Sequence, residues 1–114
     1  MFDWFTKLWN PEIRLPVGAS RRSSRWPAVR KIHLQSFPRC EVCGTRRNVE
    51  VHHWLPFHLF PDKELEFGNL ISLCESSSHN CHFIVGHCLD WQKYNANVWD
   101  DAKYLKKMLK NARG

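Results

Sequence analysis

The chain has 114 residues, of which 43% are hydrophobic, and a formal net charge of +6 at pH 7. This length fits one domain, and the absence of an apolar run near the ~20 residues of a bilayer crossing speaks against a membrane partner. The excess of lysine and arginine favours a polyanionic partner, nucleic acid before membrane, although plain solubility would also explain it.

Residues 1–18 form an aromatic N-terminal segment, and residues 19–114 are expected to fold together as one domain. Phe2, Phe5 and Trp9 have the spacing of one face of a short helix, which could cap the core or contact a partner. The segment opens acidic and aromatic, without a basic region before an apolar run, so it does not resemble a secretory signal. We therefore expect a cytoplasmic protein.

A helix is predicted from Ser24 to about Ser36, with Ser24 as its cap and Pro27 in its first turn. The side chains expected on its inward face are Val29, Ile32 and His33. Pro38 ends the helical pattern. The basic residues at its start are Arg21, Arg22 and Arg25. They could form a solvated surface or contact phosphate groups.

The run Cys40-Glu41-Val42-Cys43-Gly44 predicts a metal-binding knuckle. Two thiolates separated by two residues can hold one tetrahedral ion from a tight turn, and Gly44 permits the backbone that follows. Cys74 and Cys81 can complete a structural Zn²⁺ site, which contributes on the order of 10 kcal/mol to folding in small zinc domains. Five cysteines without an export signal do not suggest disulfides, and the fifth, Cys88, is expected in the core.

Two strands are predicted, at residues 49–54 and 69–73, joined by a loop over residues 57–67. His52 and His53 are neighbours on the first strand, so their side chains should point to opposite faces. One can therefore hold a metal ion while the other acts as a base toward water. Asn69 could accept the other ring proton of that base and fix its tautomer.

Two more helices are expected downstream, at residues 81–91 and about 99–111. The first would bury Phe83, Val85 and Leu89 and project His82 from its first turn, toward the histidine strand. The second carries an apolar stripe with four lysines pointing outward. The aromatic side chains Trp91, Tyr94 and Trp99 are expected to join the core rather than form a base-stacking surface.

Four motifs follow one another along the chain: Cys-x-x-Cys-Gly, Val-His-His-x-x-Pro, Asn-Leu-x-x-Leu-Cys and Cys-His. Each motif alone is a weak signal, but all four in this order are a strong one. In these motifs the sequence resembles the HNH endonuclease family, in its zinc-knuckle branch, over about residues 26–95. The resemblance implies an α+β fold: a small ββα-metal core at about residues 40–95, with a four-cysteine zinc knuckle and flanking helices. Similar motifs occur in nucleases of phages and mobile elements.

The resemblance also implies roles for individual residues. His53 matches the general base, and Asn69 matches the residue that orients this base and shapes the loop. His52, His82 and, as a third ligand, His87 match the ligands of one catalytic divalent cation, which could be Mg²⁺, Mn²⁺, Ni²⁺ or Zn²⁺. The cysteines that match the structural Zn²⁺ ligands are Cys40, Cys43, Cys74 and Cys81.

The sequence departs from the family pattern in two places. Six residues separate Cys74 from Cys81 where two are usual, so His79 could replace Cys81 as a zinc ligand. His87 follows His82 by five residues, which places it about 140° away around an ideal α-helix. Gly86 could permit a π-bulge or an early helix end that brings His87 back; otherwise water fills that position.

These features predict a metal-dependent DNA endonuclease that hydrolyses phosphodiester bonds. The residues expected to grip the DNA backbone are Arg21, Arg22, Arg25, Arg46 and Arg47. The alternative is a non-catalytic zinc module that binds nucleic acid or a protein, which leaves His53 without a role. In a third interpretation, the aromatic segment docks the protein onto a larger DNA-processing complex.

Overall fold

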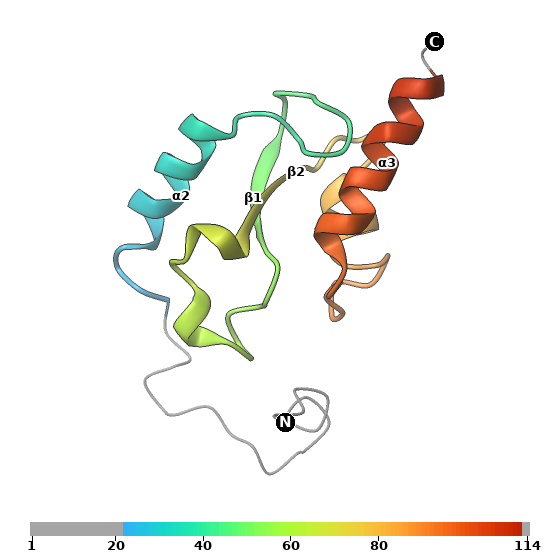
Figure 1. The fold of residues 1–114 in the computed structure, drawn as a ribbon. Helices are drawn as coiled ribbons and strands as arrows, with labels where there is room; N and C mark the ends of the chain where they lie inside the picture. Colours follow the sequence, from blue (N-terminus) through green and yellow to red (C-terminus); the bar gives the residue numbers. More distant parts are fainter. Residues whose placement is uncertain (1–21, 113–114) are drawn as a thin grey trace.

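A two-stranded antiparallel sheet with helices on either side forms the centre of the molecule (Figure 1). The computed structural model describes residues 22–112, so the aromatic segment 1–18 and Arg21 lie outside the described residues. The helices and strands are α2 (Trp26–Ser36), β1 (Val49–His53), β2 (Leu70–Cys74) and α3 (Val98–Ala112). The shorter helical turns are η2 (Pro61–Lys63), η3 (Phe67–Asn69) and the π-helical η4 (His82–Gly86).

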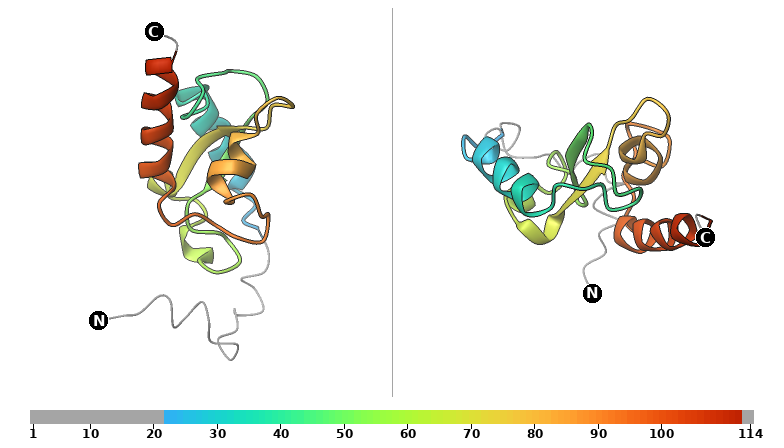
Figure 2. Two further views of the ribbon diagram at one scale, coloured as in Figure 1. Left: turned by 90° about the vertical axis from the view of Figure 1, so that its right-hand side faces the viewer. Right: turned by 90° about the horizontal axis from the view of Figure 1, so that it is seen from above.

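The predicted strand pair is confirmed, with each boundary within one residue of the expected one. In the β1–β2 register, Val49 pairs with Cys74 and His53 pairs with Leu70. All five residues of β2 are buried. Helix α2 packs against β1, and η4 contacts both strands; Figure 2 shows α2 and η4 on opposite sides of the hairpin. Because both faces of β2 are covered, its sequence does not alternate between apolar and polar residues and is apolar except for Ser72, whose hydroxyl donates to the Phe37 carbonyl at 2.7 Å.

Helix α2 occurs where the sequence predicts it, but its start and its buried face differ from the expectation. The N-cap is Arg25, and Ser23 rather than Ser24 supports the turn by accepting the Arg25 backbone N–H at 3.1 Å. His33 is the one buried residue of this helix, whereas Ile32 is 49% exposed. The narrow β1–β2 hairpin covers little of α2, so only His33 is buried.

The expected helix over residues 81–91 is shorter than predicted. After η4 the chain turns at Cys88 and Leu89, which have φ angles of 52° and 66°. The turn leaves Leu89 64% exposed and Cys88 exposed, so the expectation that both lie in the core is wrong. Asn95 closes the end of the turn, since its side chain donates to the Val85 carbonyl at 2.9 Å and its N–H donates to the Gly86 carbonyl at 3.1 Å.

Helix α3 confirms the predicted C-terminal helix and packs against η4. Val98 and Ala102 are its buried residues, while its four lysines are exposed. Trp91 and Trp99 are 53% and 40% exposed, so they do not join the core as expected. None of the helices within residues 22–112 has the length and hydrophobicity needed to cross a bilayer.

Candidate metal centres

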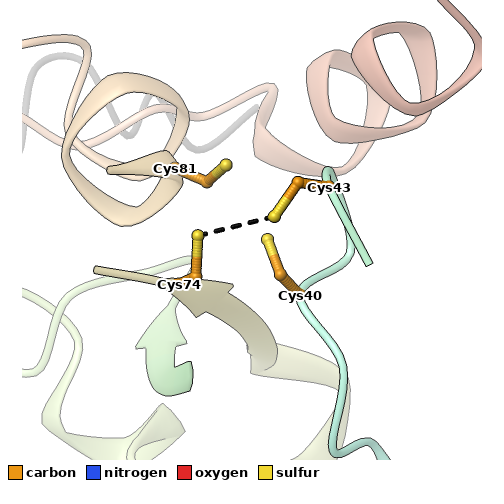
Figure 3. Close-up of side chains that lie close together, drawn as sticks. All are labelled: Cys40, Cys43, Cys74 and Cys81. Carbon is orange, nitrogen blue, oxygen red and sulfur yellow. Dashed lines mark hydrogen bonds between the residues drawn. The ribbon is translucent and has the colours of Figure 1, made fainter. Parts of the chain in front are cut away.

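Four cysteines from three separate segments converge beside the end of the sheet (Figure 3). Cys40 and Cys43 come from the loop before β1, Cys74 ends β2, and Cys81 immediately precedes η4. Their sulfur atoms all lie within 4.8 Å of one another, and those of Cys43 and Cys74 are 3.6 Å apart. Four thiol groups at this spacing suggest a tetrahedral zinc site.

The backbone around Cys40 and Cys43 folds into the tight turn that such a site requires. The Gly44 N–H donates to the Cys40 carbonyl at 2.9 Å, and the Cys40 N–H donates to the Thr45 carbonyl at 2.8 Å. Gly44 has a φ of 79°, a conformation that glycine adopts without steric cost. The Val42 N–H points at the Cys40 sulfur, 3.4 Å away, and stabilises negative charge on it.

The thiol groups are electrostatically coupled. A hydrogen bond from the Cys81 thiol, opposed by burial, lowers the pKa of Cys40 to about 4, and the same hydrogen bond raises the pKa of Cys81. Burial raises the pKa of Cys43 to about 11. The four sulfurs therefore do not all ionise by themselves, because each thiolate opposes the next. A bound cation removes this repulsion, which is how metal binding releases protons.

The long insert between Cys74 and Cys81 leaves the cysteine cluster intact. Cys81 is buried within the cluster, whereas His79 is exposed and its Nδ1 lies 2.8 Å from the Ser78 hydroxyl. The Cys74 thiol donates to the His79 carbonyl at 3.5 Å, so His79 contributes its backbone rather than its ring. The alternative in which His79 replaces Cys81 is therefore wrong.

Three histidines form a second cluster. The Nε2 atom of His82 lies 3.0 Å from Nδ1 of His52 and 3.3 Å from Nε2 of His87. His52 belongs to β1, His82 is the first residue of η4, and His87 directly follows η4. Because η4 is π-helical, residues five apart lie on the same face, as the i→i+5 pattern requires. The π-bulge suggested by Gly86 is confirmed, and it brings His87 next to His82.

The histidine rings are held in the form that can ligate a metal ion. The Nδ1–H of His87 donates to the Lys93 carbonyl at 2.7 Å, which leaves Nε2 with a lone pair. Nδ1 of His82 lies 3.5 Å from a Glu75 carboxylate oxygen. Burial, reinforced by the neighbouring imidazoles, lowers the pKa of His52 to about 2. The cluster could therefore hold one cation through three neutral imidazoles.

Replacing Gly86 with alanine is expected to disrupt this cluster. A Cβ at position 86 would lie 3.1 Å from Nδ1 and Cε1 of His52 and 3.2 Å from Cδ2 of His82. We expect G86A to weaken Mn²⁺ binding, measured by calorimetric titration, by about tenfold or more, since even outer-shell changes cost about 10- to 100-fold. The matched control is G68A, whose Cβ would meet nothing within 4 Å. Equal Mn²⁺ affinity in both variants would contradict this role of Gly86.

His53 lies beside this cluster but has different partners. Its Nε2–H donates to the Glu64 carbonyl at 2.9 Å, which makes Nδ1 the unprotonated nitrogen. The ring packs against Trp26, with the ring centroids 4.5 Å apart. Burial lowers the pKa of His53, opposed by the Glu64 hydrogen bond. His53 is thus neutral at pH 7 and has one nitrogen able to accept a proton.

The expected contact between Asn69 and His53 is absent, because the Glu64 carbonyl takes the place predicted for the asparagine. The Asn69 side chain instead accepts the Leu55 N–H at 2.7 Å and donates to the carbonyls of Leu55 and Lys63, both at 3.0 Å. Asn69 therefore ties together the two ends of the loop between the strands. Lys63 precedes Glu64, so this fixes the carbonyl that holds His53.

His53 and the three clustered histidines line one open cleft of about 330 Å³. Arg22 also lines it, with its guanidinium 4.9 Å from the centre of the Phe57 ring and 3.7 Å from the buried Glu64 carboxylate. Of the other arginines expected to contact DNA, those within the described residues are exposed outside this cleft: Arg25, Arg46 and Arg47. The cleft thus combines the positive charge of one guanidinium group with imidazole rings that can bind a metal ion or accept protons.

Several contacts that organise the site carry no clear signal in the sequence. The Glu64 and Lys93 carbonyls orient two histidines through the backbone, which every residue possesses. Glu75 could have been noticed as a carboxylate next to Cys74. No protein-family model matches the sequence, and neither the curated proteins nor the solved structures contain a significant match. The assignment of function therefore depends on the geometry of these two centres.

Proposed function

We propose that this protein is a metal-dependent DNA endonuclease of the HNH type, with a ββα-metal core formed by β1, β2 and η4. The observation that carries this proposal is the cleft in which a three-histidine cluster adjoins a separate neutral histidine. A purely structural metal site needs neither an open cleft nor a separate histidine such as His53 beside the cluster. Hydrolysis of a phosphodiester needs both a charge-neutralising site and a base.

His53 acts as the general base in this proposal. With Nε2–H held by the Glu64 carbonyl, Nδ1 takes a proton from water, and the water oxygen attacks phosphorus as the bond to the 3′ oxygen breaks. His52, His82 and His87 would hold the divalent cation, which supplies charge stabilisation at the phosphate and the departing oxygen when it is bound. Three imidazoles leave coordination positions for substrate oxygens and water.

The charge of the chain and of the cleft supports a nucleic-acid substrate. The formal net charge is +6, and Arg22 lines the cleft. Among the described residues that line the cleft there is no carboxylate side chain to repel a phosphate. Arg25, Arg46 and Arg47 are exposed and would contact the DNA backbone outside the cleft, where the cost of ordering them is offset by counterion release.

The proposal is tested by nicking of supercoiled plasmid DNA. After removal of loosely bound metal, we expect wild-type protein to relax the plasmid only when a divalent ion is returned, tested with Mg²⁺, Mn²⁺, Ni²⁺ and Zn²⁺ in turn. H82A should reduce the rate by about 100-fold or more, because losing a metal ligand should exceed the about 10- to 100-fold cost of losing an outer-shell partner.

The matched control for this assay is H79A, since His79 is exposed and belongs to neither metal cluster. We expect H79A to nick at the wild-type rate. The absence of cleavage by the wild type with every ion, on supercoiled plasmid and on a gapped duplex alike, would refute the endonuclease proposal. It would favour the alternative that the cysteine cluster alone accounts for the protein, as a non-catalytic zinc module that binds nucleic acid or a protein.

A further inference from the structure

A second cavity of about 370 Å³ adjoins the cleft of the three histidines. The residues that line both are Pro56, His58, His87, Trp91 and Tyr94. The second cavity extends away from the histidine cluster toward Gln92 and Lys93. Among its described lining residues there is again no carboxylate. A ligand can therefore place one group at the histidine cluster and an adjoining group in the second cavity.

Trp91 stands at the junction of the two cavities. Its ring centroid lies 4.9 Å from that of His87 and 5.3 Å from that of His82, in tilted and edge-on contacts. The residue nevertheless remains 53% exposed. Exposing half of a tryptophan leaves a large apolar surface in water, which folding alone does not reward. The ring also packs against Phe83, with the ring centroids 4.9 Å apart. The exposed part of Trp91 lies next to the histidine cluster and suits a flat ligand.

The segment that carries Trp91 is held in place before any ligand arrives. The Asp90 N–H donates to the His87 carbonyl at 3.0 Å, and the Lys93 N–H donates to the Asp90 carbonyl at 2.8 Å. The Lys93 carbonyl in turn accepts the Nδ1–H of His87. The backbone on both sides of Trp91 is therefore held next to the histidine cluster, and little backbone conformational entropy is lost when a ligand stacks on the ring.

We propose that the second cavity is a nucleobase subsite, in which the base next to the scissile phosphate stacks on Trp91. This inference rests on the proposed endonuclease function. A base within intact duplex is already stacked on its neighbours and cannot enter the cavity, so the subsite selects DNA with an unpaired nucleotide beside the cleavage position. Aromatic stacking tolerates any base, and selection is therefore for DNA structure rather than for sequence.

The decisive experiment combines a protein change with a substrate change. Cleavage of a gapped duplex by the full-length protein is first mapped, and the nucleotide beside the cleaved phosphate is then replaced by an abasic one. We expect the abasic site to slow the wild type by about tenfold and W91A to slow cleavage of the normal substrate by a similar factor. W91A acting on the abasic substrate should cleave no more slowly than with either change alone. W91F should retain most of the wild-type cleavage rate.

Additive losses, or an abasic site without effect on the wild type, would overturn the subsite. The matched control is W99A, because Trp99 is 40% exposed and lines neither cavity. Binding of the same oligonucleotides without added divalent ion gives a readout independent of cleavage. If the wild type binds gapped DNA about tenfold more tightly than W91A but never cleaves it, the base-binding subsite is supported and the endonuclease function is refuted. Equal binding by both proteins, with normal cleavage, would refute the subsite alone.

Discussion

Removal of zinc from the cysteine cluster is expected to unfold the domain. A structural zinc site contributes on the order of 10 kcal/mol to folding, and an ordinary domain has a net stability of only about 5–15 kcal/mol. The loss of the ion would thus consume most or all of the free energy of unfolding. We expect far-UV circular dichroism to show the loss of native structure when a strong chelator is added, and its return with Zn²⁺.

The composition of the core is the reason why we expect a bound ion to contribute much of the stability. Cys40, Cys74 and Cys81 belong to the main cluster of buried residues, together with Ile71 and Leu73 of β2. A two-stranded sheet is marginally stable on its own. The cysteine cluster joins the loop before β1, the end of β2 and the start of η4, so that one ion would fix three segments.

A matched pair of cysteine variants tests the same point without a chelator. C40S removes one ligand and should lower the zinc content and abolish cooperative unfolding, whereas C88S changes an exposed cysteine outside the cluster and should leave both unchanged. Zinc content is measured by mass spectrometry under native conditions, and stability by thermal denaturation. If the metal-free protein unfolds with the same midpoint as the zinc-loaded one, the cysteine cluster does not support the fold in this way.

The strand pair and the C-terminal helix could be predicted because their signals are local. Val49–His53 begins with β-branched residues on either side of a glutamate, Leu70–Cys74 is mostly apolar, and the periodic lysines mark Val98–Ala112. The spacing of Cys40 and Cys43 likewise encodes a turn that can hold an ion. Gly86 allowed the π-helical turn to be anticipated, and the structure confirms it.

The features that the sequence did not reveal depend on tertiary contacts. Cys88 and Leu89 adopt positive φ angles without being glycine, and the turn is closed from outside by Asn95, whose spacing from η4 has no local signature. The expected orientation of the His53 ring by Asn69 failed for a related reason. A backbone carbonyl, that of Glu64, holds the ring, and the position of a carbonyl depends on the folded loop.

Replacing His53 with alanine is expected to produce the largest loss of catalysis without loss of the fold. General-base catalysis contributes about 10²- to 10⁴-fold, so the nicking rate with the preferred divalent ion should fall by that factor in H53A. The ion held by His52, His82 and His87 should still bind, since His53 belongs to neither metal cluster. The measurement pairs plasmid nicking with calorimetric titration of the ion.

Two further measurements separate a lost base from a damaged structure. His53 is buried and packs against Trp26, so H53Q, which keeps a polar side chain of similar size, is tested beside H53A. Both should retain the wild-type thermal midpoint to within a few degrees while losing activity. Added imidazole should restore part of the rate in H53A, because it can enter the space left by the ring and accept a proton from water. Unchanged nicking by both variants would show that water is activated by another group, even if the histidine cluster binds its ion as expected.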